Sequence, residues 1–477
     1  MAKLKFTVAL LILLSLLVSI STDTATASSD EVKWSKVNIP TEGKADKWLL
    51  ADGSDVQHPA MAIDGTLYAY GQGLTYTLYQ SADNGYSWSY IGNVQDDIVD
   101  IATAPQDADT IYYATTSDVY RSIDGGQKFY QLPPNPGGAG SNNIEITSID
   151  VTHLYSNIIA VSTRDTDSSE FGGVYILDEE EITPSWTDSS PGNYDVYAVA
   201  FSPDFTANRQ LVAVVTDETD TLVISKVGNA DWGATIGNSR LDKDDSGIPT
   251  SVAVTTSAAI VFPSDYDITS ADCAHFIAIN TDSGDGDVYR INAVEAPASS
   301  TAIDLNIGSR YGLSNVDVTG LSATGSDTAI NLLAGAADSA QTYYSADGGS
   351  NWTRNRKEPT GESKTYVLMA PDFSSSGQAY TATSGSESAF SISQDDGVTW
   401  NQIGLIDTDI SNITDLAPSP GYSQDNTLFL LTFGSEHSLW RSTDSGIIWE
   451  RIFSGILADV GDIDLVKLSP NTIIINK

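Results

Sequence analysis

One eight-residue pattern, Ser-x-Asp-x-Gly-x-x-aromatic, constrains the fold of this 477-residue chain more than any other feature. It occurs as SADNGYSW (81–88), SIDGGQKF (122–129), SADGGSNW (345–352), SQDDGVTW (393–400) and STDSGIIW (442–449). An Asp carboxylate and a Ser hydroxyl can bond the backbone of a tight turn, and Gly adopts the positive φ that such a turn needs. Each copy therefore predicts a hairpin turn whose final aromatic residue packs into the core.

The spacing of the copies along the chain indicates the architecture. Ser81 and Ser122 are 41 residues apart, Ser345 and Ser393 are 48 apart, and Ser442 follows 49 residues later. This is the length of one four-stranded blade of a β-propeller.

Other segments agree with blades of this length. Three stretches share a second pattern that predicts a turn between the first and second strands of a blade, namely SPDFTANRQLVAVV (202–215), APDFSSSGQAYTAT (370–383) and SPGYSQDNTLFLLT (419–432). Between Ser122 and Ser345 the complete pattern is missing, but strand-like runs continue at 173–186, 221–232 and 287–296. We therefore expect an all-β chain, a β-propeller of about eight four-stranded blades (range seven to nine).

The two ends indicate how the ring could close. KWSKVNIP (33–40) resembles an outermost strand, and DIDLVKLSPNTIIIN (462–476) resembles the first two strands of another blade. Joining them would remove the exposed strand edges of an open ring. The alternative is that the chain stops partway through a longer array of repeats.

The N-terminus has the pattern of an export signal. Lys3 and Lys5 precede an apolar run at 6–20, and Ala25-Thr26-Ala27 follows as a small-x-small cleavage motif. The run is shorter than the ~20 residues of a membrane-spanning helix. We expect a signal peptide at 1–27, one domain at 28–477 without a transmembrane segment, and a secreted or cell-surface location.

The net charge indicates which partners the chain can bind, and the cysteine content indicates whether disulfides stabilise it. The chain has 23 Lys and Arg against 63 Asp and Glu, a formal net charge of -40, so nucleic acid would be repelled. Envelope proteins or glycans are the partners that we expect. Cys273 is the only cysteine, so no intramolecular disulfide forms.

The five stretches resemble Asp-box repeats, also called bacterial neuraminidase repeats, and the resemblance spans about 400 residues. It implies a β-propeller with the boxes at its periphery, away from the ligand-binding face. Asp boxes occur in sialidases, other glycoside hydrolases, sortilin-type receptors, photosystem assembly factors and exported prokaryotic surface proteins, and the chain is most similar to the last, non-catalytic group. The box residues are Ser81, Asp83, Gly85, Trp88, Ser122, Asp124, Gly126, Phe129, Ser345, Asp347, Gly349, Trp352, Ser393, Asp395, Gly397, Trp400, Ser442, Asp444, Gly446 and Trp449.

A sialidase-like catalytic set is incomplete. The resemblance would place one of three substrate-clamping arginines in Phe/Tyr-Arg-Ile-Pro ahead of the first box. The nearest match, YRIN (289–292), departs from that motif at Asn292, and no arginine precedes Arg121. Arg121 and Arg441 each stand directly before a box serine, where pairing between strands is the expected role. We assign no catalytic residue.

Two loops carry oxygen ligands at a spacing that calcium sites use. DKDDSG (242–247) matches the first half of a calcium-binding loop, although Ala253 stands where a bidentate carboxylate is needed, and TDSGDGDVY (281–289) clusters acids near glycines. Calcium is the one cofactor indicated, and polar surface loops are the alternative. The candidate ligands are Asp242, Asp244, Ser246, Asp282, Asp285 and Asp287.

Two functions remain. We expect an exported, non-catalytic propeller that serves as a scaffold or recognition module at the cell envelope, such as a surface-layer component. The alternative is a carbohydrate-active hydrolase, sialidase-like or of another type, with acids on blade loops and the insertion at 162–173 as a place for binding residues. Trp, Arg and facing carboxylates at the channel mouth would favour the hydrolase, whereas small and acidic residues would favour the scaffold.

Overall fold

The computed structural model describes residues 36–43, 47–92, 94, 96–241, 257–270, 273–296, 298–455 and 463–469. The chain divides into an N-terminal unit, Met1–Asn38, and a large unit, Ile39–Lys477, which holds every strand described below. The expected signal peptide lies outside the described residues. Within the described residues, no helix is both long enough and apolar enough to span a membrane.

Six separate sheets of the described part each contain four antiparallel strands, which follow the chain in order across the sheet. The first three are β1 (Asp55–Met61), β2 (Leu67–Gln72), β3 (Leu78–Ser81), β4 (Ser89–Gly92); β5 (Ile98–Thr103), β6 (Ile111–Thr115), β7 (Val119–Ser122), β8 (Tyr130–Gln131); and β9 (Ile144–His153), β10 (Asn157–Asp165), β11 (Gly173–Asp178), β12 (Thr187–Asp188). The next three are β13 (Asp195–Phe201), β14 (Gln210–Thr216), β15 (Thr221–Val227), β16 (Ser239–Arg240); β17 (Ser257–Val261), β18 (Ala274–Asn280), β19 (Val288–Asn292), β20 (Thr301–Asp304); and β21 (Val318–Thr324), β22 (Asn331–Ala336), β23 (Thr342–Ser345), β24 (Thr353–Arg354).

A seventh sheet has eight strands in the order β25-β26-β27-β28-β32-β31-β30-β29. Its strands are β25 (Ser363–Met369), β26 (Ala379–Ser384), β27 (Phe390–Ser393), β28 (Asn401–Gly404), β29 (Asn412–Pro418), β30 (Leu428–Phe433), β31 (His437–Ser442) and β32 (Glu450–Gly455). Single-turn helices α2 (Phe205–Asn208), α3 (Phe373–Ser376) and α4 (Tyr422–Asp425) stand between the first two strands of three units, where the second sequence pattern predicted turns. Two 3₁₀ turns, η3 (Pro136–Gly138) and η4 (Ser309–Tyr311), lie in loops.

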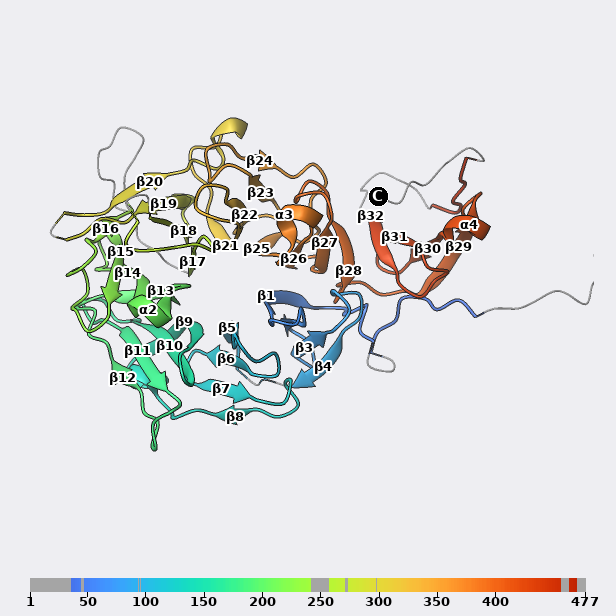
Figure 1. Cartoon of the computed structure of the whole chain (residues 1–477). Helices are drawn as coiled ribbons and strands as arrows, with labels where there is room; N and C mark the ends of the chain where they lie inside the picture. The colour runs from blue at the N-terminus through green and yellow to red at the C-terminus, as the bar shows by residue number, and fades with distance from the viewer. Residues whose placement is uncertain are drawn as a thin grey trace, which may run out of the picture. The chain divides into compact units, whose positions relative to one another are not determined.

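The first strand of each unit from β1 to β28 lines the inside of a ring (Figure 1). The inner strands β1, β5, β9, β13, β17, β21 and β25 pack in this order, and β25 and β26 return to pack on β1. The all-β propeller with four-stranded blades is thus confirmed. Apolar clusters between neighbouring sheets form the core, as in the cluster that joins Leu67 and Trp88 to Phe390 and Ile403.

The expected number of about eight blades is wrong. Six units are separate four-stranded blades, and the last two, β25–β28 and β29–β32, share one sheet. They join through the outermost strands, where Gln402 of β28 pairs with Arg451 of β32. An edge-to-edge junction leaves no place for β29–β32 as a further blade of the ring, and we call it the outer unit. The box pattern predicts turns inside a unit and does not distinguish these two ways of joining units.

Ring closure also differs from the expectation. Residues 36–40 and 463–469 form no strand, and the remaining residues of the two expected closing segments lie outside the described part. Both units at the closure are instead complete. The segment before β1 connects them, because the N–H of Trp48 donates to the carbonyl of Trp88 at 2.9 Å and the N–H of Ala51 donates to the carbonyl of Ile406 at 2.8 Å.

The predicted turn chemistry is present in all five copies of the box pattern. In the first, the Ser81 hydroxyl donates to Asp83 Oδ1 at 2.8 Å, the Gly85 N–H donates to Ser81 Oγ at 2.9 Å, and the Ser87 N–H donates to Asp83 Oδ1 at 2.8 Å. Gly85 has a φ of 87°, which non-glycine residues rarely adopt. The same contacts recur around Asp124, Asp347, Asp395 and Asp444.

The box aromatic residues anchor the turns to the core. Trp88, Trp352, Trp400 and Trp449 are buried, whereas Phe129 is only half-buried. Trp88 lies edge-on to Phe390 of the neighbouring unit, with 4.8 Å between ring centroids. The turn and its aromatic residue therefore act together, one reversing the chain and the other attaching it to the core.

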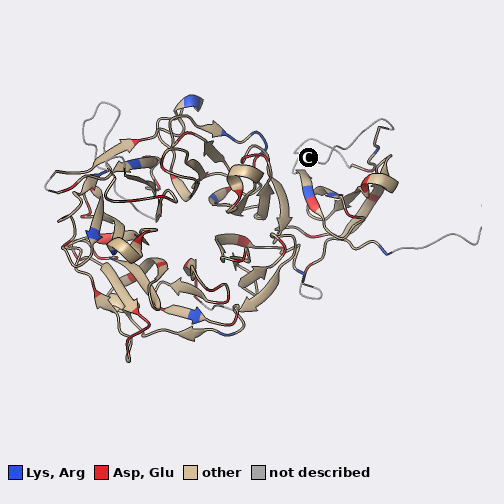
Figure 2. Ribbon diagram, in the orientation of Figure 1, with Lys and Arg blue, Asp and Glu red and all other residues tan. Residues whose placement is uncertain are grey.

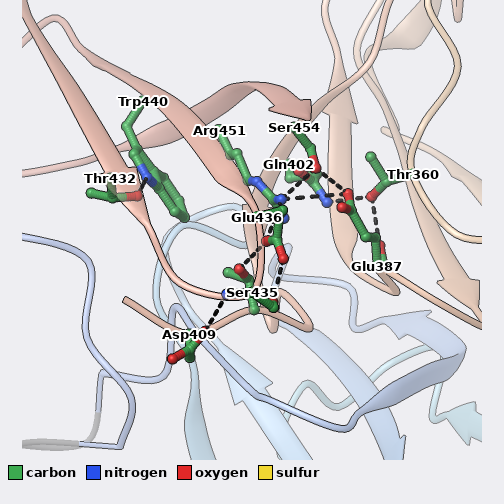
Figure 3. A network of polar contacts seen from close by, with 11 residues as sticks. Thr360, Glu387, Gln402, Asp409, Thr432, Ser435, Glu436, Trp440, Arg451 and Ser454 are labelled. Carbon is green, nitrogen blue, oxygen red and sulfur yellow. Dashed lines mark hydrogen bonds and ion pairs between the residues drawn. The ribbon is translucent and has the colours of Figure 1, made fainter. Parts of the chain in front are cut away.

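A buried charge network connects the outer unit to the ring (Figure 3). Arg451 is fully buried, and its Nη2 lies 2.7 Å from Glu436 Oε1 in the outer unit and 3.4 Å from Glu387 Oε2 in the loop between β26 and β27. Ser454 donates to Glu387, and Thr408 donates to Glu436. One guanidinium thus serves carboxylates from both halves of the eight-stranded sheet.

Replacing one box carboxylate will destabilise the ring. Asp395→Ala removes bonds from the Ser393 hydroxyl and from the N–H and hydroxyl of Thr399, and we expect a loss of about 1–2 kcal/mol. Urea unfolding measures the change, with the exposed Asp338→Ala as the control. Equal unfolding midpoints for the two variants would contradict a role for the box Asp in the turn.

Removing the buried guanidinium will weaken the outer unit's attachment. Arg451→Met leaves the buried Glu436 and the partly buried Glu387 without their cationic partner, which lowers the free energy of unfolding by about 3–5 kcal/mol. We expect faster proteolysis between β28 and β29, and partial rescue in the triple variant Arg451→Met, Glu387→Gln, Glu436→Gln. The half-exposed pair of Arg441 and Glu450 provides the control, since Arg441→Met should cost at most about 1 kcal/mol. Equal protease sensitivity of Arg451→Met and Arg441→Met would argue against the network.

Candidate functional site

A cavity of about 570 Å³ occupies the centre of the ring and is lined by its inner strands. Small residues such as Ala198, Ala259 and Gly320 line it together with hydroxyl side chains and with bulky ones such as Phe201 and Phe262. Two carboxylates, Asp100 and Asp150, line the cavity, and its described lining contains no Lys, Arg or Trp. The channel lining thus combines two acids with small and with bulky apolar residues, which does not decide between the scaffold and the hydrolase.

Asp100, on β5, is held by the backbone of two strands. Its Oδ1 accepts the N–H of Ile101 at 2.9 Å, and its Oδ2 accepts the N–H of Ile149 on the next inner strand, β9, at 3.3 Å. Inner-strand N–H groups that face the channel have no further strand to pair with, so a side-chain acceptor satisfies them. The carboxylate therefore connects two blades.

Asp150, on β9, repeats this geometry one blade further on. Its Oδ1 accepts the N–H of Val151 at 2.8 Å, and its Oδ2 accepts the N–H of Phe201 on β13 at 2.7 Å. The hydroxyl of Ser148, also on β9, accepts the N–H of Val199 on β13 at 3.1 Å. The blade interfaces β5/β9 and β9/β13 are thus joined by polar side chains from the channel wall.

Burial sets the protonation of the channel groups. It raises the pKa of Asp100 to about 7 and of Asp150 to about 6, against the opposing effect of the backbone N–H bonds. Burial, with a smaller effect of Lys364, lowers the pKa of His58 to about 3, so its ring is neutral at pH 7. The His58 ring packs on Tyr366 with 4.8 Å between centroids, across the interface where the ring closes.

Three further acids hold loops of the ring in place, and the sequence reasoning missed them. Asp55, Asp195 and Asp317 stand at or directly before an inner strand and accept N–H groups from the loop between the second and third strands of the preceding unit. Gly385 donates to Asp55 at 2.6 Å, and Gly172 donates to Asp195 at 3.0 Å. Each of the three acids is followed by Val, and this recurring Asp-Val at the start of an inner strand is the signal that could have found them.

The loop that carried half of the calcium candidates is organised by one of these acids. Asp317 accepts the N–H groups of Thr281 and Gly286 at 3.0 and 2.8 Å and that of Gly284 at 2.8 Å. The candidate ligands Asp282 and Asp285 lie on the loop, and the Ser283 hydroxyl donates to Asp285.

Asp287, the third candidate of this loop, faces the interior. It is fully buried, and it accepts the N–H groups of Val288 and Ile307 at 2.7 and 3.1 Å. Burial, with a contribution from Asp304, raises the pKa of Asp287 well above its ordinary value.

The structure does not gather these candidates into a ligand cluster. Across the described ranges, no group of three or more His, Cys, Asp or Glu side chains is placed to hold a metal ion. Asp242, Asp244 and Ser246 lie outside the described residues. Calcium binding therefore stays a prediction.

The arginines that precede box serines pair with carboxylates. Arg121 lies 2.7 Å from Glu179, and Arg441 lies 2.8 Å from Glu450 on the adjacent strand β32. Elsewhere, Asp and Glu residues are distributed around the loops, and Lys and Arg residues are sparse (Figure 2).

Comparisons with known proteins find only distant similarities, all of them to solved structures. No family model and no curated protein matches the chain. Among solved structures, the chain is similar to YCF48 from Cyanidioschyzon merolae at 14% identity and a TM-score of 0.43, over 70% of this chain and 94% of that one. It is similar to the GH74 enzyme of Niastella koreensis at 14% identity and a TM-score of 0.30, over 83% of this chain and 76% of that one. It is also similar to the α-L-arabinofuranosidase Arb93A of Fusarium graminearum at 10% identity and a TM-score of 0.38, over 74% of this chain and 99% of that one. Because every TM-score is below 0.5, these similarities carry no conclusion about this chain.

Proposed function

We propose that this protein is an exported, non-catalytic β-propeller that serves as a recognition module or scaffold at the cell envelope, for example in a surface layer, and that its five turns are Asp-box repeats. The observation that carries the proposal is the engagement of both channel carboxylates. Each accepts N–H groups of two strands, so the fold itself accounts for both carboxylates as links between blades.

Two other features support a binding role. The export pattern at 1–27 and the net charge of -40 suit an extracytoplasmic protein whose partners are neutral or cationic. The outer unit exposes large apolar side chains on its strands, among them Ile413, Leu416, Phe433 and Phe453. Apolar side chains gathered on one small unit are typical of a surface that contacts another macromolecule.

A carbohydrate-active hydrolase remains the second candidate, favoured by one observation. The pKa of Asp100, raised to about 7 by burial, is in the range of a general acid, and Asp150 is near enough to contribute to that shift. In such an enzyme, replacement of either carboxyl would abolish the release of reducing ends from a glycan while leaving the fold stable.

The two functions predict different behaviour of the double variant Asp100→Asn, Asp150→Asn. At each position the Asn side chain offers only one oxygen, so its NH₂ group faces one of the two backbone N–H donors. We therefore expect the free energy of unfolding to fall by about 1–3 kcal/mol per site. Equilibrium unfolding measures it, with Asp338→Asn as the exposed control. A fully stable double variant that has lost an activity of the wild type would identify the hydrolase instead.

The stability difference between the wild type and this double variant should also depend on pH. The folded-state pKa values of Asp100 and Asp150 lie above the unfolded value of 3.8, so the wild type gains stability from their protonation below about pH 4 and loses it as pH rises through 6 to 7. The difference in unfolding free energy between wild type and double variant should therefore shrink from pH 4 to pH 8. A difference that grows over this range would show that the carboxylates are stabilised in their charged form.

A further inference from the structure

A second cavity, of about 530 Å³, lies on the blades β9–β12 and β13–β16 and shares no lining residue with the central channel. Three aromatic side chains from three different loops line it: Phe171, Tyr194 and Trp232. Phe171 belongs to the insertion at 162–173, the place where the sequence predicted binding residues. We call this cavity the side pocket.

The aromatic residues are fixed by their surroundings. The indole N–H of Trp232 donates to the carbonyl of Ser189 on the preceding blade at 3.0 Å. The loop of Phe171 is held by Asp195, which accepts the N–H groups of Asp165 and Gly172 at 2.7 and 3.0 Å. Rings held in this way form a preformed apolar surface and lose little entropy on binding.

Polar groups stand beside the rings. Asn193, Asp217 and Asn238 also line the side pocket. Asn238 Oδ1 is buried and has no hydrogen-bond partner. The side chains of Asn193 and Asp217 are exposed, so their oxygens are the acceptors that a ligand in the pocket reaches, whereas Asn238 Oδ1 is closed to solvent.

The charge around the side pocket excludes anionic ligands. Asp217 lines the pocket, Glu218 follows it on the same loop, and the described lining contains no Lys or Arg. A carboxylate or sulfate group would meet repulsion and would find no cation to pair with. Neutral and cationic ligands remain, and three rings beside amide and carboxylate oxygens suit a neutral ligand with apolar faces and hydrogen-bond donors.

We propose that the side pocket binds a neutral saccharide through Phe171, Tyr194 and Trp232. The C–H faces of a sugar ring pack on aromatic rings, and its hydroxyls donate to the oxygens of Asn193 and Asp217. The inference deepens the proposed recognition role and rests on it, because it names the ligand class of a propeller that binds without turnover.

The test is binding of neutral pentasaccharides of glucose, xylose, mannose and N-acetylglucosamine to residues 28–477, measured by calorimetry. A pentagalacturonate and a proline-rich peptide serve as comparison ligands. We expect one of the neutral saccharides to bind, and Phe171→Ala and Trp232→Ala to weaken its binding at least about tenfold, since each removes one stacking surface. Tyr155→Ala, which removes an 80% exposed aromatic ring outside the pocket, is the matched control and should bind as the wild type does.

Trp232 also packs against its own blade, so Phe171→Ala keeps the test valid if Trp232→Ala fails to fold. Failure of all the neutral saccharides to bind, or binding of only the peptide or the pentagalacturonate, overturns the inference. Saccharide binding that neither variant changes also overturns it, while the proposed recognition function stands. Release of reducing ends that is lost in the Asp100→Asn, Asp150→Asn variant overturns the proposed function itself.

Discussion

The structure depends on how the inner strands of the ring satisfy their unpaired edges. Each inner strand pairs with the second strand of its own unit and leaves its other edge towards the channel, where backbone N–H groups need acceptors. Side chains from the neighbouring blade supply them: Asp100 serves β9, Asp150 serves β13, and the hydroxyl of Ser322 on β21 accepts the N–H of Met369 on β25 at 3.0 Å. The polar lining of the channel is therefore also what joins the blades.

The same interaction recurs in the outer unit. Asp415, on its inner strand β29, accepts the N–H of Leu416 and that of Val466, each at 2.9 Å. Asp100 makes the same two contacts, one with the next residue of its own strand and one with the following inner strand. Residues 463–469 therefore occupy, next to β29, the place that a following inner strand has in the ring. The outer unit thus carries the interaction that connects blades although it does not belong to the ring.

Some features of the fold could be predicted from the sequence because they are local. The Ser, Asp and Gly of one box lie within five residues, so a turn and its position between third and fourth strands follow from the pattern. The joining of units has no such signature. Arg451 contacts Glu387, which is 64 residues away in the sequence, and this contact lies at the junction where β28 pairs with β32 and the last two units share a sheet.

The channel carboxylates were hidden by the abundance of acids, since 63 Asp and Glu offer too many candidates. Their signal was positional: Asp100-Ile101, Asp150-Val151 and Asp415-Leu416 occupy equivalent places on inner strands, just as Asp-Val marks the start of several of them. The side pocket was predictable only as a location, the insertion at 162–173. Its rings come from three loops of two blades, and only the packed structure brings them together.

Amide hydrogen exchange in two single variants tests the central claim most directly, namely that the channel carboxylates connect neighbouring inner strands. In Asp100→Ala, exchange should accelerate in the peptide that contains Ile149 and stay unchanged at Phe201. In Asp150→Ala, it should accelerate at Phe201, on a strand that does not carry the substitution. Unchanged exchange at both positions, or equal acceleration throughout the ring in either variant, would contradict the account.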